Sequence, residues 1–574
     1  MKTEKRNQSE RLSFFKSLAE NAKNAYSDVL AILDRNMEQY RGSTKIDGSR
    51  EDAITVRNIT YEIVESQISS DIPSPKADAA VYSEQADKCA HAIEALCRSL
   101  RNRMPFEEMN DLDERYTYIY GGSVWFIEWD NSAAFGDING GVRIHCLSPK
   151  NFIPQPGIYT VEDMEYCFLI FNTTRGELMR KYDVREEDSY KAELLSSTDV
   201  LDSSDTVSII ICFYRDEDGD ICEYTFSGDL ILSDIEKYYK RKINVCKKCK
   251  NPISDCTCEG MSGHNSINAE YEIIKGKSGE GSISVPYYVP KSLPIVIRKN
   301  TSSENSLLGQ SDCEYIRPEQ QAVNKIESRI LQKLLRSGIT PIMPEGASIT
   351  LNNSVFGQVI RMRPGESPSQ YGKVDTTPNI SQDIAEAERL YEHAKRIIGI
   401  SDAYQGIGGE NESGVARSLK ISQSSGRLES KKKMKHTAYA RLDRLIFEHY
   451  LAFADEPRIL SQKDVFGKIH NSSFNRHDFL IYDVEGGFRY DDSYIFSVDL
   501  NGGSEYQREA LWQRNLENLK TGTLGDPTNP KTLLRYWQCQ ERAHYPYARE
   551  NVEYFSEMIK EGDDSYGNRD VQGC

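Results

Sequence analysis

The middle of the chain carries an apolar stripe with helical spacing. Val323, Ile326 and Ile330 recur every three or four residues within residues 312–335. This spacing places them on one face of an α-helix. Ser311, which stands directly before this stretch, is a residue type that caps helix N-termini. The pattern therefore predicts a helix over residues 312–335.

Two more helices are predicted shortly after the first. Residues 340–380 alternate short apolar runs with proline and glycine, which favours small strands and turns. Ile384 and Ile398 then fall on one face of a second amphipathic helix. A glycine-rich stretch follows at residues 406–414, and a third, longer helix is expected over residues 415–454.

The flanking parts of the chain mix helical and strand patterns. Helices are expected at residues 10–40, 58–70, 83–104, 106–120, 505–519, 530–540 and 550–559. Strands are expected at residues 120–129, 142–146, 166–172, 206–214, 221–226, 293–297, 479–484 and 494–500. The polar residues 254–281 indicate a surface loop, and the tail from residue 561 is polar enough to be disordered. With 574 residues, this pattern predicts an α+β protein with more than one domain.

Composition and charge narrow the class of protein. A formal net charge of −17 argues against a general nucleic-acid coat or a basic membrane-surface protein, although local basic groups can still contact DNA. Residues 1–11 are charged and lack the apolar core of a signal peptide. No window approaches the roughly 18 apolar residues of a membrane span. We therefore expect a cytosolic product without a membrane partner, whose 13 cysteines are mostly reduced.

Four cysteines form the sharpest local motif, at Cys246, Cys249, Cys256 and Cys258. Two closely spaced pairs of thiolates can share one tetrahedral metal ion, and the lysines between them favour the thiolate form. We interpret the motif as a structural zinc site, because four protein ligands leave no open position for catalysis. His264 is an alternative ligand at one position. A surface loop with reduced cysteines and a disulfide pair are the other interpretations.

Three short strings, in this order, resemble the centre of the portal proteins (head–tail connectors) of tailed bacteriophages. They are residues 308–312 (LGQSD) before the first helix, 321–324 (QAVN) within it and 413–416 (SGVA) after the glycine-rich stretch. The resemblance covers nearly the whole chain, but more loosely outside these strings. It identifies the chain as similar to this family.

The resemblance implies a division of the chain into the parts of a portal fold. These are a wing at 1–311 with a zinc-knuckle insertion near 246–258, a first stem helix at 312–340, a clip at 341–380, a second stem helix at 381–401, a tunnel loop at 402–414, a long wing helix at 415–454, wing strands at 455–500, and a helical crown with a flexible tail at 501–574. The knuckle is not part of the family pattern.

The resemblance also implies an assembly and a set of partners. Portal proteins form a dodecameric ring at one capsid vertex of the virion, assembled in the host cytoplasm. Double-stranded DNA is packaged and ejected through the ring. The implied partners are the terminase large subunit, the head–tail adaptor, and the major capsid and scaffold proteins.

The glycine-rich stretch takes its interpretation from the resemblance, which implies a tunnel loop facing DNA. Its residues are Gly406, Gly408, Gly409, Glu410, Asn411, Glu412 and Gly414. A phosphate-binding loop would need a preceding strand and usually a lysine, and the two glutamates would repel phosphate. A plain linker between helices is the remaining alternative.

Basic residues on the first and third helices are candidates for a channel wall or a subunit interface. They are Lys325, Arg329, Lys333, Arg336, Lys431, Lys432, Lys433 and Lys435. The alternative for the lysine run at 431–435 is a solvated helix face.

No catalytic motif is found in the sequence, which lacks a nucleophile elbow, a His-Glu-x-x-His motif and a P-loop. The acidic residues 216–220 are interpreted as a solvated hairpin turn, because they lack the ligand spacing of a calcium loop. We therefore expect no enzyme. Two alternatives stay open: a zinc-containing structural or adaptor protein of a phage particle, and a metal-dependent nucleic-acid enzyme, which would need an open metal position beside an acid–base group.

Overall fold

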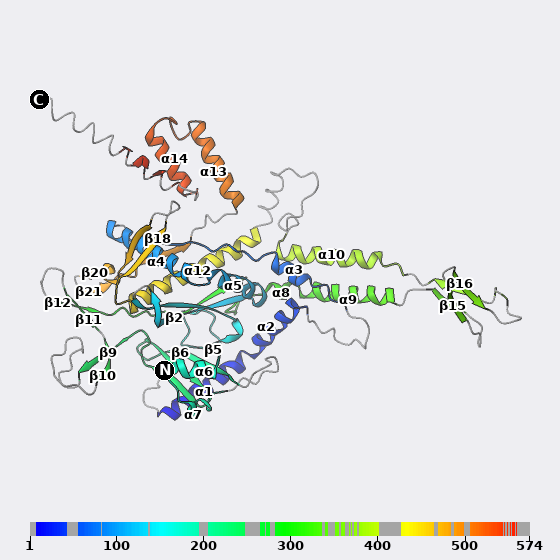
Figure 1. Cartoon of the computed structure of the whole chain (residues 1–574), viewed down its shortest axis with the longest axis horizontal. Helices are drawn as coiled ribbons and strands as arrows, with labels where there is room; N and C mark the ends of the chain where they lie inside the picture. Colours follow the sequence, from blue (N-terminus) through cyan, green and yellow to red (C-terminus); the bar gives the residue numbers. More distant parts are fainter. Residues whose placement is uncertain are drawn as a thin grey trace.

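The chain folds into a mixed body of helices and strands, from which a pair of helices projects (Figure 1). The computed structural model describes residues 7–42, 55–81, 83–135, 138–193, 205–246, 264–269, 271–275, 282–335, 339–342, 350–354, 357–361, 367, 369, 372–375, 378–400, 426–463, 469–483, 487–498, 505–542, 545, 548, 551–552, 554–556 and 558–559. The expected mixture of helix and strand is confirmed. Within these residues, no helix combines the length and the apolar character that crossing a bilayer requires.

A three-stranded antiparallel sheet, in the order β13-β2-β3, lies at the centre of the body. Its strands are β2 (Gly122–Phe135), β3 (Ile138–Leu147) and β13 (Ile295–Lys299). Helices α5 (Phe106–Tyr120) and α12 (Gly426–Phe453) pack against it. Their shared core holds the largest side chain that is fully buried, Trp125 of β2. The expected strands at 120–129, 142–146 and 293–297 are therefore confirmed, with small shifts at their ends.

The junction between α5 and β2 requires glycine at two successive positions. Gly121 ends the helix with a φ of 88°, a conformation that glycine adopts without strain. A Cβ atom at Gly122 would lie 2.6 Å from the carbonyl oxygen of Leu308 and 2.7 Å from that of Arg298. The segment that leads into the central helices therefore crosses directly over this junction.

A five-stranded antiparallel sheet forms a second layer, in the order β4-β5-β6-β7-β8. Its strands are β4 (Phe152–Pro154), β5 (Tyr166–Thr174), β6 (Thr206–Arg215), β7 (Ile221–Ser227) and β8 (Leu230–Ile235). Phe15 of α1 (Gln8–Ala25) stacks on Tyr224 with 4.3 Å between ring centroids. The N-terminal helix therefore covers this sheet.

Two of the expected N-terminal helices differ from the observed ones. The single helix expected at 10–40 is broken at Tyr26 into α1 and α2 (Ser27–Tyr40). The helix expected at 58–70 is only α3 (Ile59–Glu65). Its buried residues Ile59 and Ile63 pack against the base of the projecting helix pair.

The remaining part of the body is built around α4 (Glu84–Arg103), which begins at the Ser83 cap. This helix packs on β1 (Pro75–Ala79), β18 (Arg458–Lys463) and β19 (Ile469–Phe474). Strand β1 was not expected from the sequence, whereas β18 and β19 lie within the range 455–500, where wing strands were implied. Strand β1 pairs with β22 (Tyr494–Val498), which joins the N-terminal and C-terminal parts of the body.

Smaller elements complete the fold. They are η1 (Pro149–Asn151), α6 (Arg175–Tyr182), α7 (Glu186–Ser189), β9 (Arg241–Cys246), β10 (His264–Ala269), β11 (Tyr271–Lys275), β12 (Ser282–Pro286), η5 (Arg476–Phe479), β20 (Leu480–Asp483), β21 (Gly487–Tyr490), α13 (Glu505–Lys520) and α14 (Pro530–Arg542). Strands β10 and β11 lie within 254–281, so the surface loop indicated there is not found at residues 264–269 and 271–275.

The projecting pair consists of α9 (Arg317–Leu335) and α10 (Ser381–Ile398), which lie side by side (Figure 1). A short α8 (Asp312–Tyr315) precedes α9, so the helix expected at 312–335 is interrupted at Ile316. Between α9 and α10, the small strands expected for 340–380 are found. They are β14 (Ile339–Ile342), β15 (Thr350–Ser354), β16 (Gly357–Arg361) and β17 (Gly372–Asp375).

Candidate functional site

An apolar cluster fixes the base of the α9–α10 pair to the body. Ile59 and Ile63 of α3 are fully buried there against Val323 of α9 and Ala394 of α10. Three helices thus share one small core, because each contributes one apolar stripe at helical spacing. The base of the pair is therefore held by a small apolar core that α3, α9 and α10 share.

Ion pairs join α9 to α10 further from the body. Asp383 of α10 lies 2.5 Å from Arg329 and 2.5 Å from Lys333 of α9. The hydrogen bond from Lys333, assisted by the charge of Arg329, lowers the pKa of the Asp383 carboxyl below its usual value. These two basic side chains therefore connect the helices of one chain, while they stay partly exposed. Lys325 is exposed, and Arg336 lies outside the described residues.

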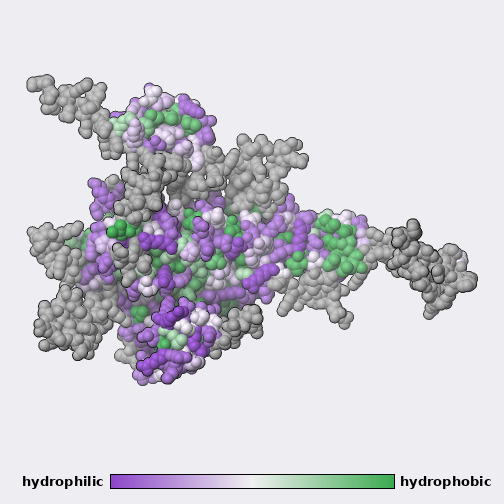
Figure 2. Space-filling model, in the orientation of Figure 1, coloured by the Kyte–Doolittle hydropathy of each residue, from purple (hydrophilic) through white to green (hydrophobic). Residues whose placement is uncertain are grey.

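Apolar side chains are exposed at the far half of the same helix pair. Leu334 and Leu335 of α9 are 47% and 68% exposed, and Ile384 of α10 is 46% exposed. Figure 2 shows the green surface that gathers over this end of the pair. We call these three residues the stem patch. Contiguous exposed apolar surface of this kind marks an interaction site more often than an isolated exposed leucine does.

Two lysines proposed for a channel wall, a subunit interface or a solvated face are buried within the single chain. Lys431 and Lys435 of α12 are 8% and 4% exposed, so none of these three interpretations describes them. A lysine is rarely buried unless a carboxylate lies beside it, and each of these two has such a partner. Their neighbours Lys432 and Lys433 are exposed, as a solvated face requires.

Lys431 binds the carboxylate of Asp312, the first residue of α8. Its Nζ lies 2.8 Å and 2.6 Å from the two carboxylate oxygens. The amide groups of Asn300 and Gln67 each donate to the same carboxylate, both at 2.8 Å. Lys431 also donates to the side-chain amide oxygen (Oε1) of Gln67 at 2.9 Å. This buried cluster, which we call the Asp312 cluster, ties α12 to the start of the helices that project from the body.

Lys435 belongs to a second buried cluster, one turn further along α12. It lies 2.8 Å from Glu114 of α5, and Arg298 of β13 lies 2.9 Å from the same carboxylate. Burial alone would raise the pKa of Glu114, but Arg298 and Lys435 outweigh it and lower that pKa. Arg298 also pairs with Asp113 at 2.5 Å. The Glu114 carboxylate is therefore held ionised between two cations.

The sequence does contain a signal for these buried lysines. Lys431 and Lys435 continue the spacing of Leu428, Ala438 and Leu442, which are all buried on α12. A lysine on the apolar stripe of a helix becomes buried when that stripe packs against the core, and a buried ammonium group needs a carboxylate beside it. The compact run of four lysines conceals this, because two of them lie on the opposite face.

The tunnel-loop residues proposed from the sequence lie outside the described residues. This holds for Gly406, Gly408, Gly409, Glu410, Asn411, Glu412 and Gly414. Helix α12 is described from Gly426 onward, and Gly399, with a φ of 92°, caps the C-terminus of α10. The interpretation of this loop stays a prediction.

Three of the four candidate zinc ligands, Cys249, Cys256 and Cys258, also lie outside the described residues. Cys246 is the last residue of β9, and the register of the antiparallel hairpin places it opposite His264, the first residue of β10. The backbone therefore brings Cys246 and His264 to the same end of one hairpin. This arrangement fits His264 as the alternative ligand weighed above, and zinc itself stays a prediction.

We expect the purified protein to contain one zinc ion per chain. Elemental analysis after exchange into metal-free buffer should find about one equivalent, because a site with four protein ligands holds its metal tightly. The Cys249→Ser variant should lose it, and Cys539→Ser, at a cysteine far from the motif in sequence, should keep it. Less than about 0.2 zinc per chain in the unmodified protein would contradict the prediction.

The acidic turn between β6 and β7 is the one group of candidate metal ligands found in the described part of the chain. It comprises Asp216, Asp218 and Asp220. Lys237 and Lys240 lie 3.4 Å and 3.2 Å from Asp220, and Asp216 accepts hydrogen bonds from the backbone of the turn. Lys237 and Lys240 thus neutralise part of the negative charge of the turn, in agreement with the interpretation as a plain hairpin turn.

Comparison of the sequence with family models and with curated proteins gives no match.

Proposed function

We propose that this chain is a phage portal protein, whose ring forms the channel for DNA packaging and ejection. The observation that carries the proposal is the helix pair α9–α10, which leaves a mixed α/β body side by side and encloses a small strand insert at its far end (Figure 1). Helix α12 begins beside the start of this pair, where Lys431 contacts Asp312, and crosses the body from there. The order of elements is that of wing, stem, clip and long wing helix.

In this proposal, the stem patch packs against a neighbouring copy of the chain. Leu334, Leu335 and Ile384 are 46–68% exposed in a single chain. Burial of this exposed part at an interface favours assembly, by less than the roughly 1.5–3 kcal/mol that full burial of such a side chain contributes. The basic residues Arg329 and Lys333 are joined to Asp383 of their own chain. Their role is thus to keep the two stem helices together.

The remaining parts follow from the same proposal. The loop at 402–414 faces the DNA, and its glutamates limit adhesion of phosphates in the channel. The terminase large subunit, a head–tail adaptor, and capsid and scaffold proteins bind outer surfaces of the ring at the virion vertex. The role is structural, not enzymatic, and the zinc knuckle stabilises an insertion in the wing.

The ring and the stem patch can be tested together by negative-stain microscopy and light scattering. We expect rings with an axial hole for the unmodified chain, if necessary after co-expression with shell and scaffold proteins. Leu335→Asp should abolish the rings without unfolding the chain, because Leu335 is 68% exposed in one copy and a surface substitution changes stability by only about 0.5 kcal/mol.

Val81→Asp is the matched control, since Val81 is also an exposed apolar residue, at 80%, but lies in the body before α4. It should assemble normally. A chain that stays monomeric under all of these conditions would argue for a monomeric structural or adaptor protein. Rings that persist in Leu335→Asp would remove the stem patch from the interface.

A further inference from the structure

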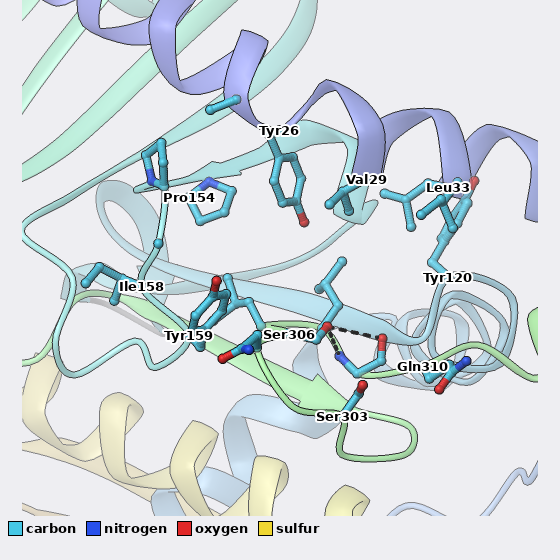
Figure 3. Close-up of a pocket in the computed structure, with 18 of the residues that line it drawn as sticks. Tyr26, Val29, Leu33, Tyr120, Pro154, Ile158, Tyr159, Ser303, Ser306 and Gln310 are labelled. Carbon is cyan, nitrogen blue, oxygen red and sulfur yellow. Dashed lines mark hydrogen bonds between the residues drawn. The ribbon is translucent and has the colours of Figure 1, made fainter.

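A cavity of about 420 Å³ lies on the side of the body where α1 meets α2. Its walls come from that helix junction, from residues 154–159 after β4, and from residues 303–310, the segment that leads into α8 (Figure 3). Tyr26, Tyr120 and Tyr159 all line it, and we call it the tyrosine pocket. Neither the assembly proposed above nor the buried lysine clusters use this cavity.

Part of the lining of the tyrosine pocket is apolar. Val29 and Leu33 of α2 face Pro154 and Ile158 across the cavity (Figure 3). The helix break at Tyr26 has a consequence here, because it turns the tyrosine ring out of the helix and into the cavity (Figure 3). An aromatic and proline-lined surface of this kind binds flat, rigid apolar groups well.

Other side chains that line the cavity offer hydrogen-bond donors. The side chains of Tyr26, Asn305 and Gln310 line the cavity, and none of the three has a protein hydrogen-bond partner within the described part of the chain. Burial raises the pKa of the Tyr26 hydroxyl above its usual value, so this group keeps its proton. Asn305 adopts a φ of 54°, which asparagine tolerates better than most residues. The pocket therefore presents donors that a ligand with free carbonyl groups would satisfy.

The charge of the cavity excludes phosphate ligands. No lysine, arginine or histidine occurs among the lining residues, all of which the structure describes, and Glu314 is the single charged group. Lys150 lies over the outer face of the Tyr120 ring, but it pairs with Asp34 and does not line the cavity. A nucleotide or phosphopeptide would thus meet a carboxylate and no cation.

We propose that the tyrosine pocket binds a proline-containing extended segment, without acidic residues, of a partner protein. Such a segment adopts the polyproline II conformation, which forms no internal hydrogen bonds and leaves its carbonyl groups free to accept. Aromatic grooves with nearby donors recognise it, because proline rings pack on the aromatic faces and the donors bind the carbonyls. Tyr26, Asn305 and Gln310 supply those donors, and the tyrosines and prolines supply the faces.

An array of immobilised decapeptides that vary in proline, aromatic and acidic content tests this directly with the full-length chain. We expect peptides with two or more prolines and no acidic residue to be retained. The best of them should bind saturably in fluorescence anisotropy. Replacement of its prolines by alanine, or of one neutral residue by glutamate, should abolish binding.

Three variants of the chain locate the binding site. Tyr159→Ala removes an aromatic wall that is 42% exposed and should weaken binding at least about tenfold. Tyr26→Phe keeps the ring and removes one donor, so roughly fivefold weaker binding is expected. Tyr271→Ala, at a tyrosine 59% exposed on β11, is the matched control and should bind normally.

The result is independent of ring assembly, because a single chain contains the whole cavity. Absence of any saturable peptide would overturn the proposal. It would also be overturned if binding survived both Tyr159→Ala and Tyr26→Phe, or if alanine-substituted or acidic peptides bound equally well. Saturable binding of a fluorescent nucleoside triphosphate in the anisotropy measurement, lost in Tyr159→Ala, would overturn the proposal and assign the pocket to another ligand class.

Discussion

Replacement of Asp312 by asparagine is expected to lower the free energy of unfolding by about 3–5 kcal/mol. The carboxylate is 1% exposed and is held by three donors, of which the Lys431 ammonium is the only charged one. Asparagine preserves the size of the side chain but leaves Lys431 as a buried charge without a counter-charge. Urea denaturation, followed by tryptophan fluorescence, measures the loss.

The Lys431→Met variant is expected to cost less than Asp312→Asn. In that variant the Asp312 carboxylate keeps its two amide donors, from Asn300 and Gln67, and hydrogen bonds to a charged group contribute about 1.5–3 kcal/mol each. The double variant should be less destabilised than the sum of the two single variants, because no unpaired charge is left. That coupling separates loss of the ion pair from a general packing defect.

A surface ion pair on the same helix provides the control. Lys433 lies 3.3 Å from Glu429, and both side chains are more than 60% exposed. Exposed pairs contribute about 0–1 kcal/mol, so Glu429→Ala should leave the denaturation midpoint nearly unchanged. If Asp312→Asn proved no more costly than Glu429→Ala, the buried cluster would have no role in joining α12 to α8.

The helical centre of the chain could be predicted from its sequence because local spacing determines it. The apolar stripes of α9 and α10 face each other, and Ser311 caps the first helix as expected, since its side chain accepts a hydrogen bond from the Cys313 backbone. The prediction failed at Ile316, where the helix is interrupted. The interruption is tied to tertiary packing, because Ile316 is fully buried in the core at the base of the stem.

The strands that local pattern did not reveal are those that depend on distant partners. Strand β1 pairs with β22, more than 400 residues later in the chain, and its residues Pro75–Ala79 show no strong strand preference. Strand propensity reflects packing on a neighbour more than it reflects the backbone. The partners of Lys431 and Lys435 were hidden for the same reason, because Asp312 and Glu114 are far away in the sequence.

Acidification from pH 6.5 to pH 4 is expected to destabilise the protein through His449, which lies near the end of α12. This ring is fully buried, and burial lowers its pKa to about 4. Its Nδ1 lies 2.7 Å from the Leu445 carbonyl oxygen, which can only accept, so Nδ1 carries the proton of the neutral ring. The other ring nitrogen, Nε2, is buried without a hydrogen-bond partner among the described residues, and a second proton there would be an unpaired charge.

The sign of the effect follows from the two pKa values. The unfolded chain takes up a proton on this residue near pH 6.5, whereas the folded chain resists it until about pH 4. The contribution of the neutral ring is therefore complete above pH 6.5, is lost progressively between pH 6.5 and pH 4, and is gone below pH 4. The total loss is about 3 kcal/mol, at about 1.36 kcal/mol per pKa unit.

The measurement compares the unmodified chain with His449→Phe in urea at a series of pH values. Phenylalanine fits among the neighbouring rings of Tyr239 and Phe453 and cannot be protonated. Carboxylates that titrate in the same range affect both proteins alike, so the difference between the two curves isolates His449. His91→Phe, at an exposed histidine on α4, should follow the unmodified chain throughout. A His449→Phe curve parallel to that of the unmodified chain between pH 6.5 and 4 would mean that the folded protein accepts the proton at this site without cost.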